Sequence, residues 1–331
     1  MDFLSKFRIL KGWPGLVIGL VLLVSGLILI FGWLWSSEPG AFNIQENAMQ
    51  HAGATEEKLV PGYVLGATLS RVASTMLDKP GGYISNDVFP PGVFLDNIAN
   101  WEFGVLVQVR DLARVMRNDF SRSQSQSAED QDLAKAEPLF NFDNNSWIFP
   151  DSEGEYRKAI SSIDKYLGRL QTGDQNRALF HARADNLRDW LGIVDKRLGS
   201  LAQRLSASVG QVRVDMDANV QDGAGQPSLV EVKTPWLEID DVFYEARGTA
   251  WALIHFLQAA EVDFGDVLAK KNATLSLKQI IRDLQATQDT VWSPMILNGR
   301  GFGLVTNYSL IMTSYISQAN AAVIDLRNLL A

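Results

Sequence analysis

The chain has 331 residues, 47% of them hydrophobic, and a formal net charge of −8 at pH 7. These values describe a globular protein with an acidic surface. They argue against nucleic-acid binding, because an acidic protein repels the phosphate backbone. The sequence contains no cysteine, which excludes disulfide bonds, thiol nucleophiles and thiolate metal sites.

The first element along the chain is an apolar segment at residues 16–35 that carries no charged side chain. About 20 such residues suffice for one helix to cross a bilayer. Trp13 lies just before the segment, and Trp33 and Trp35 lie at its end, as is typical of membrane interfaces. A cleaved signal peptide, the main alternative, has a shorter apolar core and a small-residue cleavage site. We therefore predict that residues 16–35 form a single transmembrane helix in contact with the lipid bilayer.

The charges on either side of this helix predict its orientation. Three basic residues precede it: Lys6, Arg8 and Lys11. Acidic residues follow it, with no Lys or Arg before Lys58, and basic flanks are retained on the cytoplasmic side. Residues 1–15 are therefore expected to be a short cytoplasmic N-terminus. The rest of the chain is expected on the outer side of a bacterial inner membrane, in the periplasm.

Two regions follow the predicted anchor. Residues 36–59 combine polar side chains with Gly, Pro and Glu, and we predict a juxtamembrane tether to which we assign no secondary structure. Residues 60–331 are long enough for one large domain or two small ones. We expect a helical outer domain there.

Helical periodicity dominates this outer region. Apolar residues recur in steps of three and four over residues 180–205, and the same pattern occupies residues 156–170. A short break near Gly173 separates the two patterns, so we predict a long antiparallel αα-hairpin over residues 152–208. Leu205 is expected near the end of the longer arm, where it projects as a surface for a partner or a second copy.

Other segments extend this mainly α prediction to a helical bundle. Apolar periodicity marks residues 65–76, 101–120, 243–260 and 308–326, with a further helix near 280–284. The exception is an alternating pattern at residues 211–217 and 228–233, separated by a turn-rich stretch, which predicts a small β-hairpin.

Four sequence stretches together resemble a known family. They are residues 77–92, 101–112, 121–127 and 140–147. Their sequence is similar to that of the bacterial inner-membrane family catalogued as domain of unknown function 2333. The resemblance covers most of the chain, including the single anchor. It implies no reaction, so no catalytic residue follows from it.

The long loop at residues 79–100 is the best candidate for a functional surface, because long ordered loops often carry function. Its aromatic and polar side chains suit a glycan or an extended peptide. The alternative is that the aromatic residues only close the end of the bundle. The candidate residues are Tyr83, Asn86, Asp87, Phe89, Phe94, Asp96 and Trp101.

Residues that could carry catalysis or bind a metal are sparse. The three histidines are far apart in sequence, which argues against a zinc site, and we expect His255 on a surface or secondary face of its helix. No cofactor site is predicted. Glycan hydrolysis needs only two carboxyl groups on facing walls of a groove. The carboxylate candidates are Glu102, Asp111, Glu153, Glu155, Glu238 and Glu245.

Three functions therefore remain open. The favoured one is a membrane-anchored interaction or scaffolding protein that binds an envelope protein or itself. The alternatives are a carboxylate-dependent, glycan-active enzyme of the cell envelope and a ligand-binding outer domain. Two carboxyl groups across an open cleft would favour the enzyme, and a filled bundle would favour the scaffold.

Overall fold

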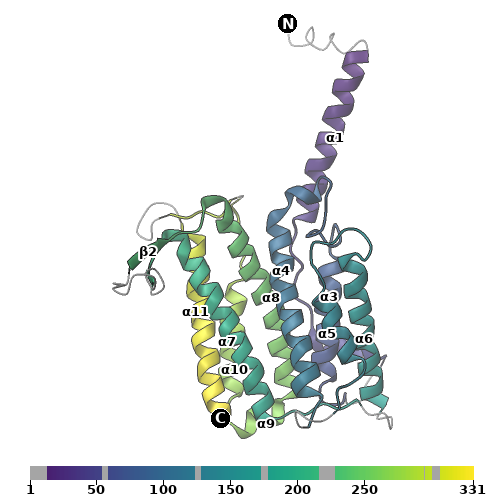
Figure 1. The fold of residues 1–331 in the computed structure, drawn as a ribbon, viewed down its shortest axis with the longest axis vertical. Helices are drawn as coiled ribbons and strands as arrows, with labels where there is room; N and C mark the ends of the chain where they lie inside the picture. The colour runs from purple at the N-terminus through teal and green to yellow at the C-terminus, as the bar shows by residue number, and fades with distance from the viewer. Residues whose placement is uncertain are drawn as a thin grey trace, which may run out of the picture.

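The computed structural model describes residues 13–53, 59–123, 128–172, 178–215, 228–293, 295–299 and 306–331. Within these ranges the chain is mostly helical, as predicted (Figure 1). The α-helices are α1 (Trp13–Trp35), α2 (Ile44–Ala52), α3 (Tyr63–Asp78), α4 (Asp96–Val115), α5 (Leu133–Phe140), α6 (Ser152–Thr172), α7 (Ala184–Ser206), α8 (Ile239–Asp263), α9 (Gly265–Lys270), α10 (Thr274–Ala286) and α11 (Tyr308–Leu330). Short helical turns are η2 (Gly92–Phe94), η3 (Met116–Phe120), η4 (Ala207–Val209) and η5 (Trp236–Glu238).

Helix α1 stands apart from the bundle and extends away from one end of it (Figure 1). It is long and apolar enough to cross a membrane, and almost none of it is buried against the rest of the chain. We call the end of the bundle from which α1 extends the anchor end. The opposite end, where α8 finishes, is the far end.

Helices α4 and α8 form the centre of the bundle and run side by side in the same direction (Figure 1). Asn100 donates a hydrogen bond to Asp241 near their starts, at 2.7 Å. Near their ends the rings of Phe120 and Phe264 are 5.3 Å apart. Helices α3, α5 and α6 cover one side of this central pair, and α7, α10 and α11 cover the other.

The predicted αα-hairpin over residues 152–208 is wrong, although both of its helices exist. Helix α6 packs against α3 and α5, whereas α7 packs against α11 on the other side of the bundle. Phe180 is not helical: its ring packs against Phe120 and Phe264. The backbone amide of His181 donates to the carbonyl of Phe120. The chain therefore crosses the bundle between α6 and α7 instead of turning back on itself.

The predicted β-hairpin is present. Strand β1 (Gln211–Asp215) pairs antiparallel with β2 (Ser228–Val232), with Gln211 opposite Val232 and Asp215 opposite Ser228. It lies toward the anchor end, beside α7 and α11 (Figure 1). The turn-rich stretch between the strands and the predicted end of the first strand lie outside the described residues.

Residues 36–59, to which the sequence assigns no secondary structure, contain α2 and are held against the bundle in the part that the structure describes. Glu38 forms a 2.7 Å ion pair with Arg247 of α8. The ring of Phe42 stacks on that of His255 at 4.1 Å, and Ile44 is buried at the start of α2. His255 is itself fully buried, contrary to its expected position on a surface or secondary face. A few apolar and charged residues thus attach an otherwise polar segment to the bundle.

Candidate functional site

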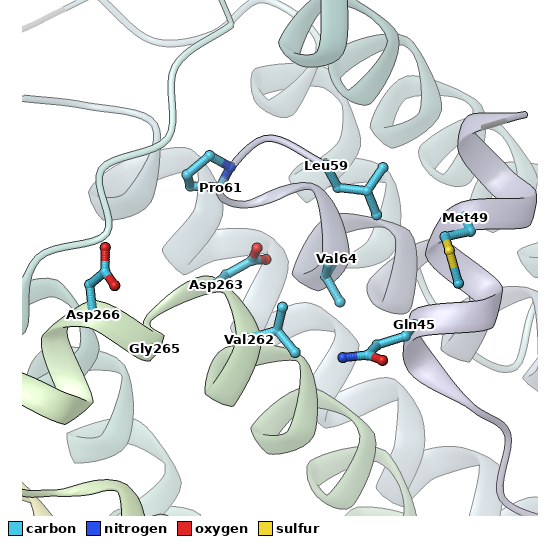
Figure 2. Close-up of a pocket in the computed structure, with 9 residues that line it drawn as sticks. All are labelled: Gln45, Met49, Leu59, Pro61, Val64, Val262, Asp263, Gly265 and Asp266. Atoms are coloured by element: carbon cyan, nitrogen blue, oxygen red, sulfur yellow. The ribbon is translucent and has the colours of Figure 1, made fainter. Parts of the chain in front are cut away.

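A pocket of about 420 Å³ opens at the far end of the bundle, where α2, the start of α3 and the α8–α9 junction meet (Figure 2). Most of its wall is apolar, and carboxylate and amide groups occupy the remainder. Its lining residues are Gln45, Met49, Leu59, Pro61, Val64, Val262, Asp263, Gly265 and Asp266. Their side chains come from segments that are far apart in the sequence.

Asp263 is positioned by the start of α3. The N-cap residue of that helix is Gly62, which has no side chain to accept a hydrogen bond from the first turn. The Asp263 carboxylate takes this role and accepts a hydrogen bond from the backbone amide of Leu65 at 2.7 Å. A negative charge is favourable there, because the first turn of a helix has unpaired amides and a partial positive charge.

The protonation of Asp263 reflects two opposing effects. Burial disfavours its charged form and raises its pKa to about 7, although backbone amides of α3 oppose this shift. The carboxyl group is therefore divided between its neutral and ionised forms near neutral pH. A cation placed beside it would favour the ionised form.

The pocket also offers apolar surface to a ligand. Met49 on α2 and Val262 on α8 are both about 40% exposed, and a methionine side chain adapts its shape to different apolar partners. Asp266 is exposed at the start of α9 and adds a second carboxylate to the lining (Figure 2). The combination suits an apolar group that carries a positive charge.

Residues 9–331 match a family described as an uncharacterized protein conserved in bacteria, DUF2333. The chain belongs to the DUF2333 family. This confirms the family resemblance seen in the sequence. No curated protein and no solved structure matches the chain. The family's description assigns no activity, so the function of this DUF2333 protein has to be argued from its structure.

Most of the carboxylates considered for glycan hydrolysis are engaged in ion pairs. Glu102 is buried against Lys79 at 2.6 Å, and Asp111 accepts from Arg197 at 2.6 Å. Glu155 and Glu245 are paired with Lys158 and Arg204. Glu153 is half-buried, and desolvation raises its pKa. None of the six candidates lines the pocket in Figure 2.

The candidate residues of the loop at 79–100 differ in their exposure to solvent. Phe89, Phe94 and Asp96 are exposed, and Asp87 is half-buried. The others are buried: Tyr83, Asn86 and Trp101. The buried aromatic residues therefore close the end of the bundle, which was the alternative interpretation, whereas the two phenylalanines remain available to a partner.

Leu205 does not project from the bundle. It is 1% exposed, so the prediction that it forms a partner surface is wrong. The reason is that α7 packs along α11 and not along the shorter α6. The whole apolar stripe of α7, including Leu191 and Leu205, is buried within one chain.

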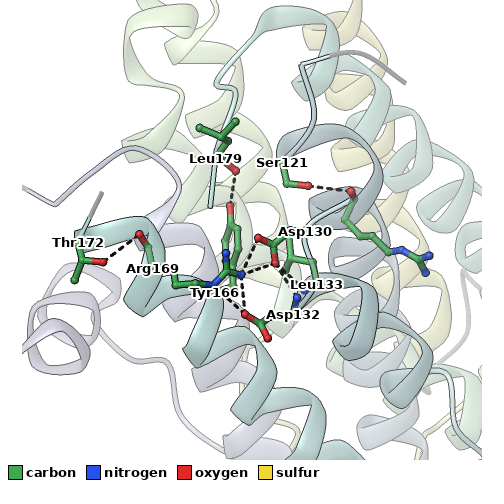
Figure 3. A network of polar contacts seen from close by, with 9 residues as sticks. Ser121, Asp130, Asp132, Leu133, Tyr166, Arg169, Thr172 and Leu179 are labelled. Atoms are coloured by element: carbon green, nitrogen blue, oxygen red, sulfur yellow. Dashed lines mark hydrogen bonds and ion pairs between the residues drawn. The ribbon is translucent and has the colours of Figure 1, made fainter. Parts of the chain in front are cut away.

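Another polar cluster, between the start of α5 and the end of α6, has a structural role. Arg169 holds both Asp130 and Asp132, at 2.8 and 2.7 Å (Figure 3). Asp130 also accepts a hydrogen bond from the amide of Leu133 in the first turn of α5. Tyr166 donates to the carbonyl of Leu179 at 2.8 Å. The cluster fixes the start of α5 and the segment that crosses the bundle.

Metal binding has no support in the part of the chain that the structure describes, where no three His, Cys, Asp or Glu residues are grouped suitably. The far-end pocket itself was missed by sequence reasoning. One signal could have indicated it: Pro61-Gly62 precede an apolar helix and supply no N-cap side chain. Some other residue then has to satisfy the amides of that first turn.

Proposed function

We propose that this DUF2333 protein is a membrane-anchored interaction module of the bacterial envelope. Helix α1 crosses the inner membrane once, with the N-terminus in the cytoplasm and the bundle in the periplasm. The pocket at the far end binds an apolar, positively charged segment of an envelope protein. The exposed apolar surface of α1 and its basic N-terminal flank support the anchor.

The composition of the far-end pocket carries the binding proposal. Its apolar wall supplies burial for a partner side chain, while Asp263 and Asp266 supply negative charge. The pocket is also well separated from the anchor. Helix α8 has 25 residues, so its two ends are roughly 37 Å apart at 1.5 Å per residue. A partner in the periplasm could reach the pocket, whereas lipid could not.

The enzyme alternative has weaker support. Carboxyl groups that act as general acid and base must be free to exchange protons with substrate. Glu102 and Asp111 are instead bound by Lys79 and Arg197. Ligand binding by the same pocket is the second candidate, since about 420 Å³ is enough for a small apolar amine.

The binding proposal can be tested by site-specific photocrosslinking in native membranes. We expect a photoreactive residue at Met49 and one at Val262 to give the same discrete adduct with a single envelope protein. The same residue at Leu275 on α10, which is 78% exposed, serves as the control and should give none. An equal pattern from all three positions, or no adduct from either pocket position, would contradict the proposal.

Charge reversal gives a second, independent readout. Asp266→Lys places a cation at the exposed rim of the pocket and is expected to abolish the adduct at Met49. Asp189→Lys changes the net charge equally at an exposed position of α7 and is the matched control. Retention of the adduct in Asp266→Lys would show that the partner is not recognised through positive charge.

Topology is tested separately by thiol labelling, which the absence of native cysteine makes clean. In intact spheroplasts, a cysteine at Ser5 is expected to be shielded from an impermeant reagent, and a cysteine at Glu57 to be labelled. The reverse pattern would overturn the proposed orientation and the periplasmic location.

A further inference from the structure

Large apolar side chains are exposed together at the anchor end of the bundle. They include Phe89, Phe94, Trp147, Phe149, Trp236 and Leu237, which are each between 56% and 94% exposed. We call these six the anchor-end residues. Large apolar side chains exposed at one end of a domain are candidates for an interaction surface.

Three separate segments bring these residues to the same end. The loop before α4 is tied to the loop before α6, because Tyr83 donates to the carbonyl of Asn144 at 3.0 Å and Asn86 to that of Ser146 at 2.9 Å. The start of α8, which follows Trp236 and Leu237, is tied to the start of α4 by the Asn100–Asp241 hydrogen bond. The grouping therefore belongs to the packed fold.

The last turn of helix α1 contacts this end of the bundle. A Cβ atom built at Gly32 would lie 3.6 Å from Pro91 and 3.9 Å from Leu95. One built at Gly81 would fall 2.6 Å from the ring of Trp35, so that ring lies on the glycine backbone. The loop is thus level with the last turn of α1, where a spanning helix meets the membrane interface.

The anchor is also attached beyond its last turn. Arg247 of α8 pairs with Glu38 and donates to the carbonyls of Thr287 and Asp289. Because residues 36–43 lie against α8, the bundle is not free to swing away from α1 on a long tether. The distance between the anchor end and the membrane surface is therefore short.

We propose that the anchor end docks on the outer leaflet of the same membrane that α1 crosses, with the anchor-end residues inserted at the boundary between headgroups and acyl chains. The inference rests on the proposed membrane span of α1. Continuity with that span selects lipid as the occupant. Tryptophan is favoured at this depth, because its ring is apolar and its N–H reaches water, which fits Trp147 and Trp236. The phenylalanines and Leu237 add apolar area for insertion.

The charges around the anchor-end residues define the chemistry of the contact. Asp96, Asp240 and Asp241 lie at the same end, and the ammonium of Lys79 is buried against Glu102. The docking is therefore driven by apolar insertion into a zwitterionic leaflet. It does not need the polybasic attraction to anionic lipid that many peripheral proteins use.

The test uses the full chain reconstituted in phosphatidylcholine vesicles, with a single nitroxide on an introduced cysteine. The labelled variants are Phe94→Cys and Phe149→Cys, with Leu275→Cys as the control outside the lipid and Leu22→Cys as the control within α1. The nitroxide is then exposed to two collision reagents, oxygen and a nickel chelate. Oxygen concentrates in lipid, whereas the nickel chelate stays in water. We expect the ratio of oxygen to nickel collisions at positions 94 and 149 to exceed that at position 275 several-fold, in high salt as in low salt.

Each alternative result has a distinct meaning. A lipid-like ratio at position 22 with a water-like ratio at 94 and 149 would overturn the docking and leave the anchor intact. A water-like ratio at position 22 would overturn the membrane span and the docking with it. Low access to both reagents at 94 and 149 would show that protein covers this end, and would also overturn the proposal.

Discussion

The ammonium of Lys79 lies 2.6 Å from the carboxylate of Glu102, and neither side chain has any exposed surface. Glu102 also accepts hydrogen bonds from the backbone amides of Ile84 and Ser85 and from the Ser85 hydroxyl. Lys79 donates to the carbonyl of Gly82. One buried ion pair thus folds the loop before α4 onto that helix, and the loop carries two of the anchor-end residues.

The first prediction concerns this ion pair. Lys79→Met leaves the Glu102 carboxylate buried without its counter-ion, although burial already raises its pKa and favours protonation. We expect the free energy of unfolding to fall by about 3–5 kcal/mol, as is typical when one partner of a buried pair is removed. Chemical denaturation of the full chain in detergent measures it.

The pair Arg157–Asp78 provides the control, because both of its side chains are more than half exposed. Arg157→Met should change the free energy of unfolding by less than about 1 kcal/mol. If the two substitutions changed the free energy of unfolding by similar amounts, Lys79 would contribute no more to stability than an exposed charge does.

The second prediction concerns the attachment of the segment that follows α1. Glu38→Gln removes the charge that holds Arg247, and hydrogen bonds to charged groups contribute about 1.5–3 kcal/mol. We expect faster amide exchange in residues 36–43, with little change in α11. Glu46→Gln, in the same part of the chain but exposed, is the matched control. Unchanged exchange in Glu38→Gln would mean that the contacts of Gly40 and Phe42 with α8 hold the segment without Glu38.

The positions of the helices could be predicted from the sequence, but which helix packs against which could not. Steps of three and four show which face of a helix is buried, and α6 and α7 occupy much the same residues as predicted. The pattern does not show what covers that face. Leu205 follows the same periodicity whether α7 packs on α6 or on α11.

The far-end pocket could not be predicted for a similar reason. Asp263 matters because it caps a helix 198 positions away, at Leu65. Its own neighbours in the sequence resemble those of an ordinary helix end. The length and the Pro and Gly content of the loop at 79–100 indicate Phe89 and Phe94 as surface candidates. The same features indicate Tyr83 and Trp101, which are buried.

The third prediction is a pH dependence that depends on Asp263. Its pKa is raised from 3.8 to about 7 in the folded protein, so the folded state binds more protons than the unfolded state between these values. Its contribution to stability is therefore fully present below pH 3.8 and is lost as pH rises through about 7. Over that range it should fall by roughly 2–4 kcal/mol.

The comparison variant is Asp263→Asn, whose amide oxygen still accepts from the amide of Leu65. We expect it to be more stable than the native chain at pH 8. The difference should shrink as pH falls toward 4. Asp266→Asn, at an exposed position, should show no such trend. Parallel stability profiles for the native chain and Asp263→Asn would exclude a raised pKa at Asp263.

The fourth prediction follows from the burial of α7. Leu191 and Leu205 are at most 1% exposed, so aspartate at either position places an unpaired charge in the core. Each substitution is expected to cost several kcal/mol, a large part of a typical domain's stability. Leu275→Asp, on the exposed face of α10, should be nearly neutral. Normal thermal stability of Leu205→Asp with loss of self-association would restore the projecting-helix interpretation.

The last prediction concerns the contact between the two central helices. A Cβ atom at Gly104 would lie 2.1 Å from the carbonyl oxygen of Glu245, and one at Gly248 would lie 2.0 Å from that of Trp101. Both clashes are with backbone, which no side-chain rotation relieves, so α4 and α8 would have to separate. We expect Gly104→Ala and Gly248→Ala each to destabilise the fold by at least the roughly 1–3 kcal/mol typical of overpacked cores.

Gly168 in α6 is the matched control for these two glycines. A Cβ atom there meets nothing within 4 Å, so Gly168→Ala gains helix propensity without a clash and should stabilise the protein by about 0.5–1 kcal/mol. The same substitution is thus expected to lower the free energy of unfolding at position 104 and to raise it at position 168. If Gly104→Ala were also stabilising, α4 and α8 could not approach each other as closely as the structure places them.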